Sequence, residues 1–203
     1  MTTSATVIVM GGDSYHHGNL RADLLKRAEA VLAESGADGL SLRALARDLG
    51  VSHAAPSRHF RDRQALLDAL AVSGFTTLNA RMGQAAAGPE PVADRLAELG
   101  RTYVRFAVEH APLLNLMFTV KHDSASTQEL RDLGHESLAI AARLIAEGQA
   151  ASEVRPGDPA ALAQVAFSSM HGLAVLAVGS LLEDTPLEAA VELTLEVLLA
   201  GLR

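Results

Sequence analysis

The chain has 203 residues, enough for one or two domains, and its formal net charge at pH 7 is −7. It is 49% hydrophobic but only 3% aromatic, and it has no cysteine, which excludes disulfides and thiolate metal sites. Alanine and leucine dominate and favour helices, so we predict an all-α fold. Residues 13–81 carry nine Lys/Arg against eight Asp/Glu, whereas residues 82–203 carry eight against sixteen. The N-terminal part can therefore present a local basic face despite the acidic total.

The first residues have no recognisable structural pattern. Residues 1–14 carry no Lys or Arg and are predicted to form a flexible arm. Residues 7–10 are apolar but too few for a signal-peptide core, and Met10 is an alternative start. The first helix is predicted over residues 19–35, where Leu20 and Leu24 begin an apolar face at helical spacing.

Two short helices joined by a tight turn are predicted over residues 41–60. The apolar residues between Leu42 and Leu49 recur at helical spacing. Gly50 follows, where glycine most easily adopts a left-handed C-cap, and Ser52 could cap the second helix through its hydroxyl oxygen. This is the pattern of a helix-turn-helix, whose second helix lies in the DNA major groove. An ordinary helical hairpin with a solvated basic face would give the same pattern.

Cations and hydroxyls gather on this pair of helices and just after it. The start of the second helix would meet base edges, whereas Ser41, His59 and Arg63 would hold phosphates, which fixes register without reading sequence. The candidate DNA-binding residues are Ser41, Arg43, Ser52, His53, Ala54, Ala55, Ser57, Arg58, His59 and Arg63. We therefore predict a three-helix DNA-binding domain over residues 15–62.

Residues 63–203 are predicted to form a second, helical domain. One helix is expected over residues 62–86 and the next over residues 92–109. Pro112 starts a short helix, and Ser124 or Ser126 can cap a long helix that runs to about residue 150.

The last two helices are strongly apolar. Asp158 with Pro159, and Thr185 with Pro186, are typical of helix starts. Residues 160–182 carry no Asp, Glu, Lys or Arg and could span a bilayer, but they lack basic flanks and an aromatic belt. A helix at the centre of a homodimer, without membrane, explains them better, since two such helices from each subunit build a four-helix bundle; an intrachain core is the alternative. The stripe expected at the dimer interface is Ala166, Met170, Leu173, Ala174, Ala177, Val191, Leu195, Leu198 and Leu199.

Three segments resemble a known family. Residues 50–70, GVSHAAPSRHFRDRQALLDAL, resemble the recognition helix and following helix of TetR-type transcriptional repressors. Residues 15–36 and 110–118 resemble one branch of that family, whose C-terminal domain is named for a tryptophan, histidine and glycine. In the matching stretch, FSSMHGL, the histidine and glycine are present, but phenylalanine stands where the tryptophan is expected.

Two residues depart from the family pattern. Ser57 stands where members usually have tyrosine, so the hydroxyl is kept but the ring is lost. Arg63 stands where members have lysine, and it keeps the positive charge.

The resemblance implies a repressor that binds a palindromic double-stranded operator as a two-fold homodimer. It implies a cytoplasmic protein that is not an enzyme, uses no cofactor and is released from DNA by a small apolar or amphipathic effector. The effector would lie in residues 63–203, the effector-binding and dimerisation domain, between apolar walls with a few polar groups. The candidate lining residues are Tyr103, Phe106, Met117, Phe118, His135, Phe167, Met170, His171 and Ala174.

Two other classes stay open. One is an architectural DNA-binding protein without an effector, and the other is a helical metal-dependent enzyme. The enzyme would need paired Glu-x-x-His motifs on facing helices, whereas the chain has one Asp-x-x-His. Its Asp132 and His135 could hold a metal together with His171. No glycine-rich phosphate loop and no Gly-x-Ser-x-Gly elbow occurs, so we expect no metal and no cofactor.

Overall fold

The computed structural model describes residues 19–123 and 126–203, and all regular secondary structure within them is helical. The all-α prediction is therefore confirmed. The α-helices are α1 (Leu20–Ser35), α2 (Leu42–Asp48), α3 (Arg63–Ala86), α4 (Val92–Glu109), α5 (Ala111–Lys121), α6 (Gln128–Ala150), α7 (Pro159–Val178) and α8 (Leu187–Leu202). Two single 3-10 turns, η1 (Ala37–Gly39) and η2 (Pro56–Arg58), flank α2. The predicted arm, the alternative start and Ser124 lie outside the described residues.

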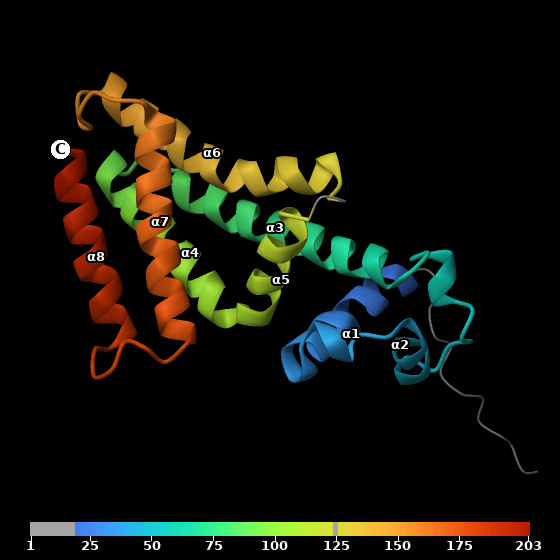
Figure 1. The fold of residues 1–203 in the computed structure, drawn as a ribbon. Coiled ribbons are helices and arrows are strands. Elements are labelled where there is room, and N and C mark those ends of the chain that lie inside the picture. The colour runs from blue at the N-terminus through green and yellow to red at the C-terminus, as the bar shows by residue number, and fades with distance from the viewer. Residues whose placement is uncertain (1–18, 124–125) are drawn as a thin grey trace, which may run out of the picture.

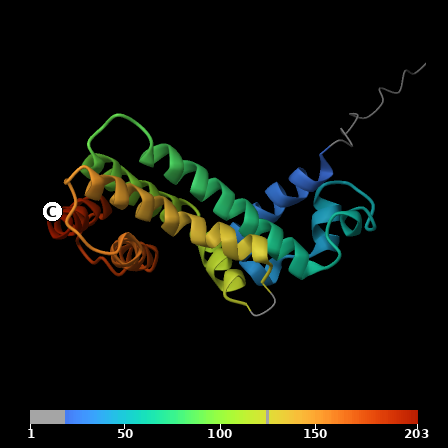
Figure 2. The same ribbon diagram turned by 90° about the horizontal axis from the view of Figure 1, so that it is seen from above.

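The molecule is elongated, with its two ends joined by one long helix (Figure 1). α1, α2 and η2 occupy one end, and α7 and α8 lie side by side at the other. α3 starts in the first end and runs beside α6 toward the second, while α5 lies between α1 and α3 (Figure 2). The N-terminal helices therefore contact the rest of the chain through α3 and α5.

Two helix starts are capped by aspartate side chains, and the cap at Asp158 is the one that the sequence predicts. The carboxylate of Asp62 accepts a hydrogen bond from the backbone N–H of Ala65 at 2.8 Å and begins α3. Asp158 accepts from the N–H of Ala160 at 3.0 Å, with Pro159 as the first residue of α7. These side chains satisfy N–H groups that have no partner inside the helix.

Two predicted caps are wrong. Thr127, not Ser126, caps α6, and its hydroxyl accepts from the N–H of Leu130 at 3.2 Å. Ser126 is buried one residue earlier, too far from the first turn to cap it. Thr185 does not cap α8 either, because Pro186 occupies the position next to the helix and offers no side-chain acceptor.

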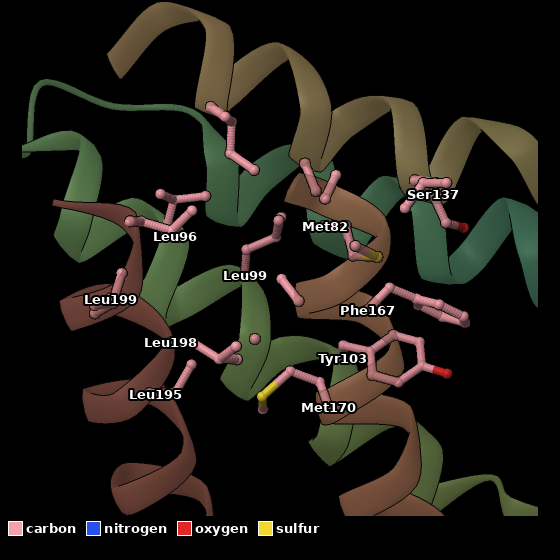
Figure 3. A pocket seen from close by; sticks show the side chains of 17 residues that line it. Met82, Leu96, Leu99, Tyr103, Ser137, Phe167, Met170, Leu195, Leu198 and Leu199 are labelled. Atoms are coloured by element: carbon pink, nitrogen blue, oxygen red, sulfur yellow. The ribbon is translucent and has the colours of Figure 1, made fainter. Parts of the chain in front are cut away.

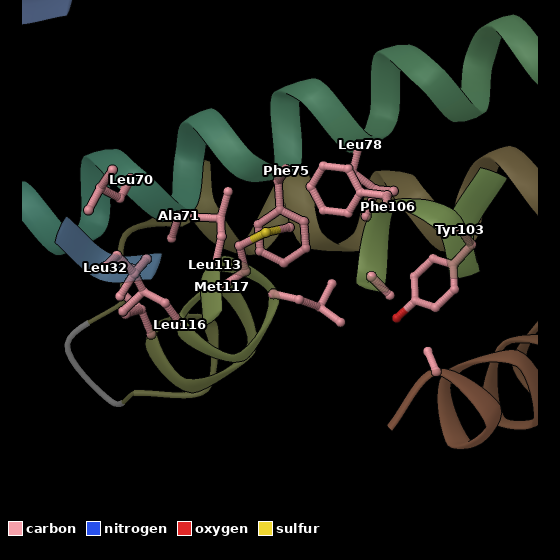
Figure 4. Packing of buried hydrophobic residues seen from close by; sticks show 14 of the residues in the cluster. Leu32, Leu70, Ala71, Phe75, Leu78, Tyr103, Phe106, Leu113, Leu116 and Met117 are labelled. Carbon is pink, nitrogen blue, oxygen red and sulfur yellow. The ribbon is translucent and has the colours of Figure 1, made fainter. Parts of the chain in front are cut away.

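A single large hydrophobic cluster runs from α1 to α8. Between α3, α4 and α5 it contains Phe75, Leu78 and Phe106, all almost completely buried (Figure 4). α3 and α5 approach most closely at Gly74, where a Cβ atom would lie 2.5 Å from the sulfur of Met117. Only glycine leaves room for that side chain, so the two helices are packed without a gap.

The apolar stripe predicted for the dimer interface faces mostly inward. Met170, Leu173, Ala174, Val191 and Leu195 are buried within the chain. The sequence could not choose the face because both helices carry apolar residues around most of their circumference. A different set is exposed: Val165, Val175, Leu176 and Val178 of α7, Leu181 of the following loop, and Leu193 and Val197 of α8.

Helix α7 is the most apolar of the described helices. Among the residues that the structure describes, it is the one helix long and apolar enough to cross a membrane, and 22% of its most apolar stretch is buried inside the chain. A helix whose exposed face packs against another protein chain has the same composition.

Candidate nucleic-acid interface and ligand cavities

The turn after α2 has the predicted glycine geometry. Gly50 has φ of 66°, in the left-handed region that favours glycine. Its N–H donates to the carbonyl of Arg47, and the N–H of Val51 donates to the carbonyl of Ala46 at 2.9 Å. These bonds close α2 and turn the chain toward the second element of the pair.

That second element is shorter than predicted. After a turn at residues 53–55, only Pro56–Arg58 forms a helical turn, of the 3-10 type. Pro56 has no N–H to donate to the carbonyl of Ser52, which accepts from the N–H of Ala55 at 2.9 Å instead. The cap residue of the 3-10 turn is Ala55, so the predicted capping role of Ser52 is wrong.

The candidate DNA-binding residues lie at one end of the molecule, on α2, the turn, η2 and the first residue of α3 (Figure 1). Nine of the ten are exposed, and Ala55 is half-buried. Phe60 anchors the segment, because it is 2% exposed and lies under the guanidinium of Arg21, 5.5 Å from the ring centre. The segment thus offers polar side chains to a partner while its end is held in the core.

Arg63 has a structural role that sequence reasoning missed. Its guanidinium donates to the carbonyls of Ala37 at 2.6 Å and Leu40 at 3.2 Å, and lies 3.8 Å from the carboxylate of Asp38. It therefore ties the first turn of α3 to η1. A guanidinium carries five N–H donors, so these bonds leave donors for a phosphate.

The candidate effector residues border three cavities among the helices of residues 63–203. The leucine cavity, about 70 Å³, is lined by side chains of α3, α4, α6, α7 and α8 (Figure 3). The central cavity, about 400 Å³, lies between α3, α4, α6 and α7, next to the end of α5. The α5 cavity, about 240 Å³, lies between α4, α5 and α7.

An aromatic quartet, Tyr103, Phe118, Phe167 and His171, forms the walls between these cavities. Tyr103 and Phe167 line both the leucine and the central cavity, and Phe118 and His171 line both the central and the α5 cavity. The rings of Phe167 and His171 are stacked with centroids 5.3 Å apart, and Phe118 lies 5.1 Å from His171. Each wall is therefore a single layer of rotatable side chains.

One hydrogen bond fixes the polar centre of the quartet. The hydroxyl of Tyr103 lies 2.7 Å from Nδ1 of His171. Burial raises the pKa of the Tyr103 hydroxyl and lowers the pKa of the His171 imidazole, because both charged forms would lose water. At neutral pH both groups are therefore neutral, and the tautomer of the imidazole sets which of them donates in this bond.

Protonation of His171 should weaken the fold. Because its folded pKa is lowered, the unfolded chain binds more protons, so this contribution to stability is complete above about pH 6.5 and is lost as the pH falls through the folded pKa. We expect the loss of melting temperature on acidification to be smaller in His171→Gln than in the wild type. His53→Gln, at an exposed histidine, is the control and should retain the wild-type loss. Equal losses in all three proteins would contradict the assignment.

Seven of the nine candidate effector-site residues border a cavity. They are Tyr103, Phe118, His135, Phe167, Met170, His171 and Ala174. The structure places the other two in the solid core. Phe106 lies under the guanidinium of Arg81, and Met117 fills the space that Gly74 leaves.

Sequence reasoning missed polar and small residues that share the cavity walls. The central cavity is also lined by Lys121, Gly134, Ser137 and Gln164. Aromatic side chains stand out in the sequence as candidate lining residues, whereas these residues face a cavity only because α5 and α6 bring them there. One of them could have been noticed in the sequence: Lys121 is one of the chain's two lysines and stands at the end of an apolar helix.

The metal site suggested by the sequence is not formed. Among the described residues, no three His, Asp or Glu side chains are grouped as metal ligands would be. Asp132 accepts a hydrogen bond from Gln128 at 2.7 Å on its own helix. His135 is exposed and faces the central cavity.

A helix-turn-helix element at one end and a helical body with internal cavities define the class: a DNA-binding regulator with an appended helical domain. Two family models match the sequence. Residues 24–70 match the model of bacterial regulatory proteins of the tetR family, and residues 96–202 match the tetracyclin repressor-like C-terminal domain. The chain belongs to the TetR family of transcriptional regulators.

Solved structures agree with this assignment. A Rhodococcus sp. RHA1 protein of unknown function is 47% identical, with a TM-score of 0.88 over 94% of this chain and 99% of that one. FadR from Bacillus subtilis, solved with stearoyl-CoA, is 18% identical, with a TM-score of 0.74 over 90% of this chain and 100% of its own. PfmR from Thermus thermophilus is 19% identical, with a TM-score of 0.70 over 89% of this chain and 98% of its own. The last two share the fold alone, and no curated protein matches the sequence.

Proposed function

We propose that this TetR-family regulator is a ligand-responsive repressor. It binds a palindromic operator as a homodimer and leaves DNA when a small apolar or amphipathic effector enters its cavities. The observation that carries the proposal is the aromatic quartet, which has cavities on both sides and includes a residue of α5. Because α5 also packs against α1 and α3, a ligand that moves Phe118 acts on the helices that hold the DNA-binding end.

The connection between the two ends has two parts. The first is α3, which runs from the DNA-binding end into the helical domain and is in close contact with α5 at Gly74 and Met117. The second part is the corner between α4 and α5, where His110 lies 3.4 Å from the carboxylate of Glu29 on α1. An effector shifts the DNA-binding equilibrium only if it favours one position of these helices over the other. A coupling of about 1–3 kcal/mol would be typical.

The dimer is proposed to form through the exposed faces of α7 and α8. Val165 of α7, and Leu193 and Val197 of α8, are each more than 60% exposed. A large exposed apolar face of this kind marks a surface at which another protein chain binds. A second copy supports the DNA-binding role, because one helix-turn-helix reads too few base pairs and a two-fold dimer matches a palindrome. A regulator that binds an operator on the bacterial chromosome acts in the cytoplasm, and we propose this location here.

The effector site also supports membership of the branch named for its tryptophan, histidine and glycine. His171 and Gly172 match that pattern, and His171 is the polar centre of the quartet. FadR shares the fold and was solved with stearoyl-CoA, so an elongated apolar ligand suits the row of cavities here.

The test begins with selection of bound fragments from random DNA by the full chain, which defines the operator. A compound library is then screened for thermal stabilisation of the protein and for release of that operator. We expect at least one apolar or amphipathic compound to do both. A palindromic operator that no compound releases would support an architectural DNA-binding protein without an effector.

The predicted DNA contacts divide by role. Arg63→Ala should weaken binding to all sequences similarly, because a phosphate contact is lost. The slope of log K against log salt concentration (the salt slope) should become shallower by roughly one. His53→Ala should change the preference at one base position, at a cost of about 1–3 kcal/mol. Both are measured by fluorescence anisotropy over a series of salt concentrations and operator variants.

Folding needs a separate control in this experiment. Arg63 also holds the carbonyls of Ala37 and Leu40, so the melting temperature of Arg63→Ala is recorded alongside, and Arg58→Ala repeats the test at an exposed cation on η2. Arg143→Ala, on α6 far from the DNA-binding end, should change nothing. An altered base preference in Arg63→Ala with an unchanged salt slope would reverse the roles.

A further inference from the structure

The central cavity is lined by one cationic side chain, that of Lys121, and by no carboxylate among the described residues. Lys121 and three histidines, His122, His135 and His171, border it, and no Asp or Glu of the described residues lines any of the three cavities. This contrasts with the surrounding sequence, because residues 82–203 carry twice as many acidic as basic residues. A cavity without carboxylates in an acidic domain favours an anion over a cation.

Lys121 is held in place at the edge of this cavity. It ends α5, and its side chain crosses α6 so that Nζ donates to the carbonyl of Gly134 at 3.1 Å. A Cβ atom at Gly134 would lie 2.5 Å from Cδ of Lys121 and 2.6 Å from its Cε, so an alanine there would displace the lysine side chain from this path. Burial lowers the pKa of the ammonium, because the charged form loses water there. An ammonium has three N–H donors, and the bond to Gly134 uses one.

On the side opposite Lys121, the central cavity adjoins the apolar leucine cavity. Tyr103 and Phe167 separate it from the leucine cavity, which Leu195, Leu198 and Leu199 of α8 close at the far side (Figure 3). Along this line the lining changes from cationic at Lys121 to aromatic and then to aliphatic. A ligand that contacted the cationic, the aromatic and the aliphatic part of this lining would have a charged head and an apolar chain.

We propose that the effector is an anionic amphiphile, with its anionic group at Lys121, His122 and His135 and its apolar chain directed between Tyr103 and Phe167 toward the leucine cavity. This rests on the proposed effector role of the cavities and adds the chemical class. The ammonium supplies the charge, the histidines supply further hydrogen bonds, and the aromatic pair moves apart to admit the chain.

The test compares probes that share one chain and differ in the head group: decanoate, decanol and decyltrimethylammonium. Binding to the full-length protein is measured by calorimetry. We expect decanoate to bind at least about tenfold more tightly than decanol, because hydrogen bonds to a charged partner are the stronger ones, and decyltrimethylammonium to bind weakest. Decanoyl-CoA is a fourth probe that separates a free carboxylate from a phosphorylated thioester as the source of the anion.

Matched variants locate the head group. Lys121→Met should remove the preference for decanoate over decanol while decanol binding stays the same. Lys26→Met makes the same change at the other lysine, which is exposed on α1, and should behave as the wild type. Gly134→Ala keeps the charge but displaces it, so it should also lower decanoate affinity; circular dichroism confirms that each variant is folded.

Two results would overturn the proposal. One is equal affinity for decanoate and decanol in the wild type, and the other is an unchanged ratio in both Lys121→Met and Gly134→Ala. If decanol binds equally well and still releases the operator, the effector role stands and only the anionic class fails. If none of the four probes binds, the proposed class fails, and the library screen decides the effector role separately.

Discussion

Carboxylates placed on the exposed face of α8 are expected to separate the subunits and abolish operator binding. Leu193 and Val197 are 62% and 65% exposed and lie one helical turn apart, so they point to the same side. In a two-fold dimer each substitution appears twice. An unpaired charge removed from water costs several kcal/mol, and about 1.4 kcal/mol is a factor of ten in affinity. Leu193→Glu with Val197→Glu should therefore raise the dimer dissociation constant at least about a hundredfold.

Sedimentation and operator anisotropy measure the two effects together. Val108→Glu is the matched control, because Val108 is an exposed valine on α4, outside the proposed interface on α7 and α8, and this variant should stay dimeric. Deleting residues 186–203 is less informative. It also removes the buried Leu195 and breaks the ion pair of Arg101 with Glu192 at 2.6 Å, so it would unfold the chain. A double variant that remains dimeric and binds DNA normally would rule out this interface.

Truncation of Phe75 should cost the most stability of any single change considered. Phe75 is completely buried on α3, and its ring meets Phe118 edge-on with centroids 5.8 Å apart. Phe→Ala in a core typically costs about 3–5 kcal/mol through lost burial and the cavity left behind. The midpoint of urea denaturation of Phe75→Ala should fall by a corresponding amount, with little change in slope.

The neighbouring residue provides the control. Thr76 is exposed on the same helix, and its hydroxyl donates to the carbonyl of Val72 at 2.8 Å, so Thr76→Ala should stay within about 0.5 kcal/mol of the wild type. Phe75→Ala should also loosen Phe118 and weaken the link between effector and operator. A loss below about 1 kcal/mol would mean that α3 and α5 close the cavity by moving together.

Local chemistry predicted most helix boundaries. Residues 92–109 form α4 as predicted, and Asp158 caps α7 as its sequence context indicates. These predictions depend on neighbours within one turn. The second element of the helix-turn-helix is shorter than predicted, because Pro56 has no N–H to donate and only a 3-10 turn forms at Pro56–Arg58.

Predictions that depended on how one helix packs against another were less accurate than those that depended on local sequence. The inward face of α7 and α8 could not be chosen from the sequence, because apolar residues surround both helices. His171 and Phe167 were found as candidate site residues because they stand out by type, and the structure brings them together with Tyr103. Ser137 and Lys121 face the same cavity only through the packing of α5 and α6, which no local pattern records.

The path of Lys121 across Gly134 makes the two positions interdependent in evolution. An alanine at position 134 would push the end of the Lys121 side chain off its path, whereas a short side chain at position 121 would not meet it. The effect of a substitution at one position therefore depends on the residue at the other, because glycine at 134 leaves lysine at 121 its place beside the cavity. Among related regulators, lysine at 121 should occur with glycine at 134, and lineages that lose the glycine should take effectors of a different charge.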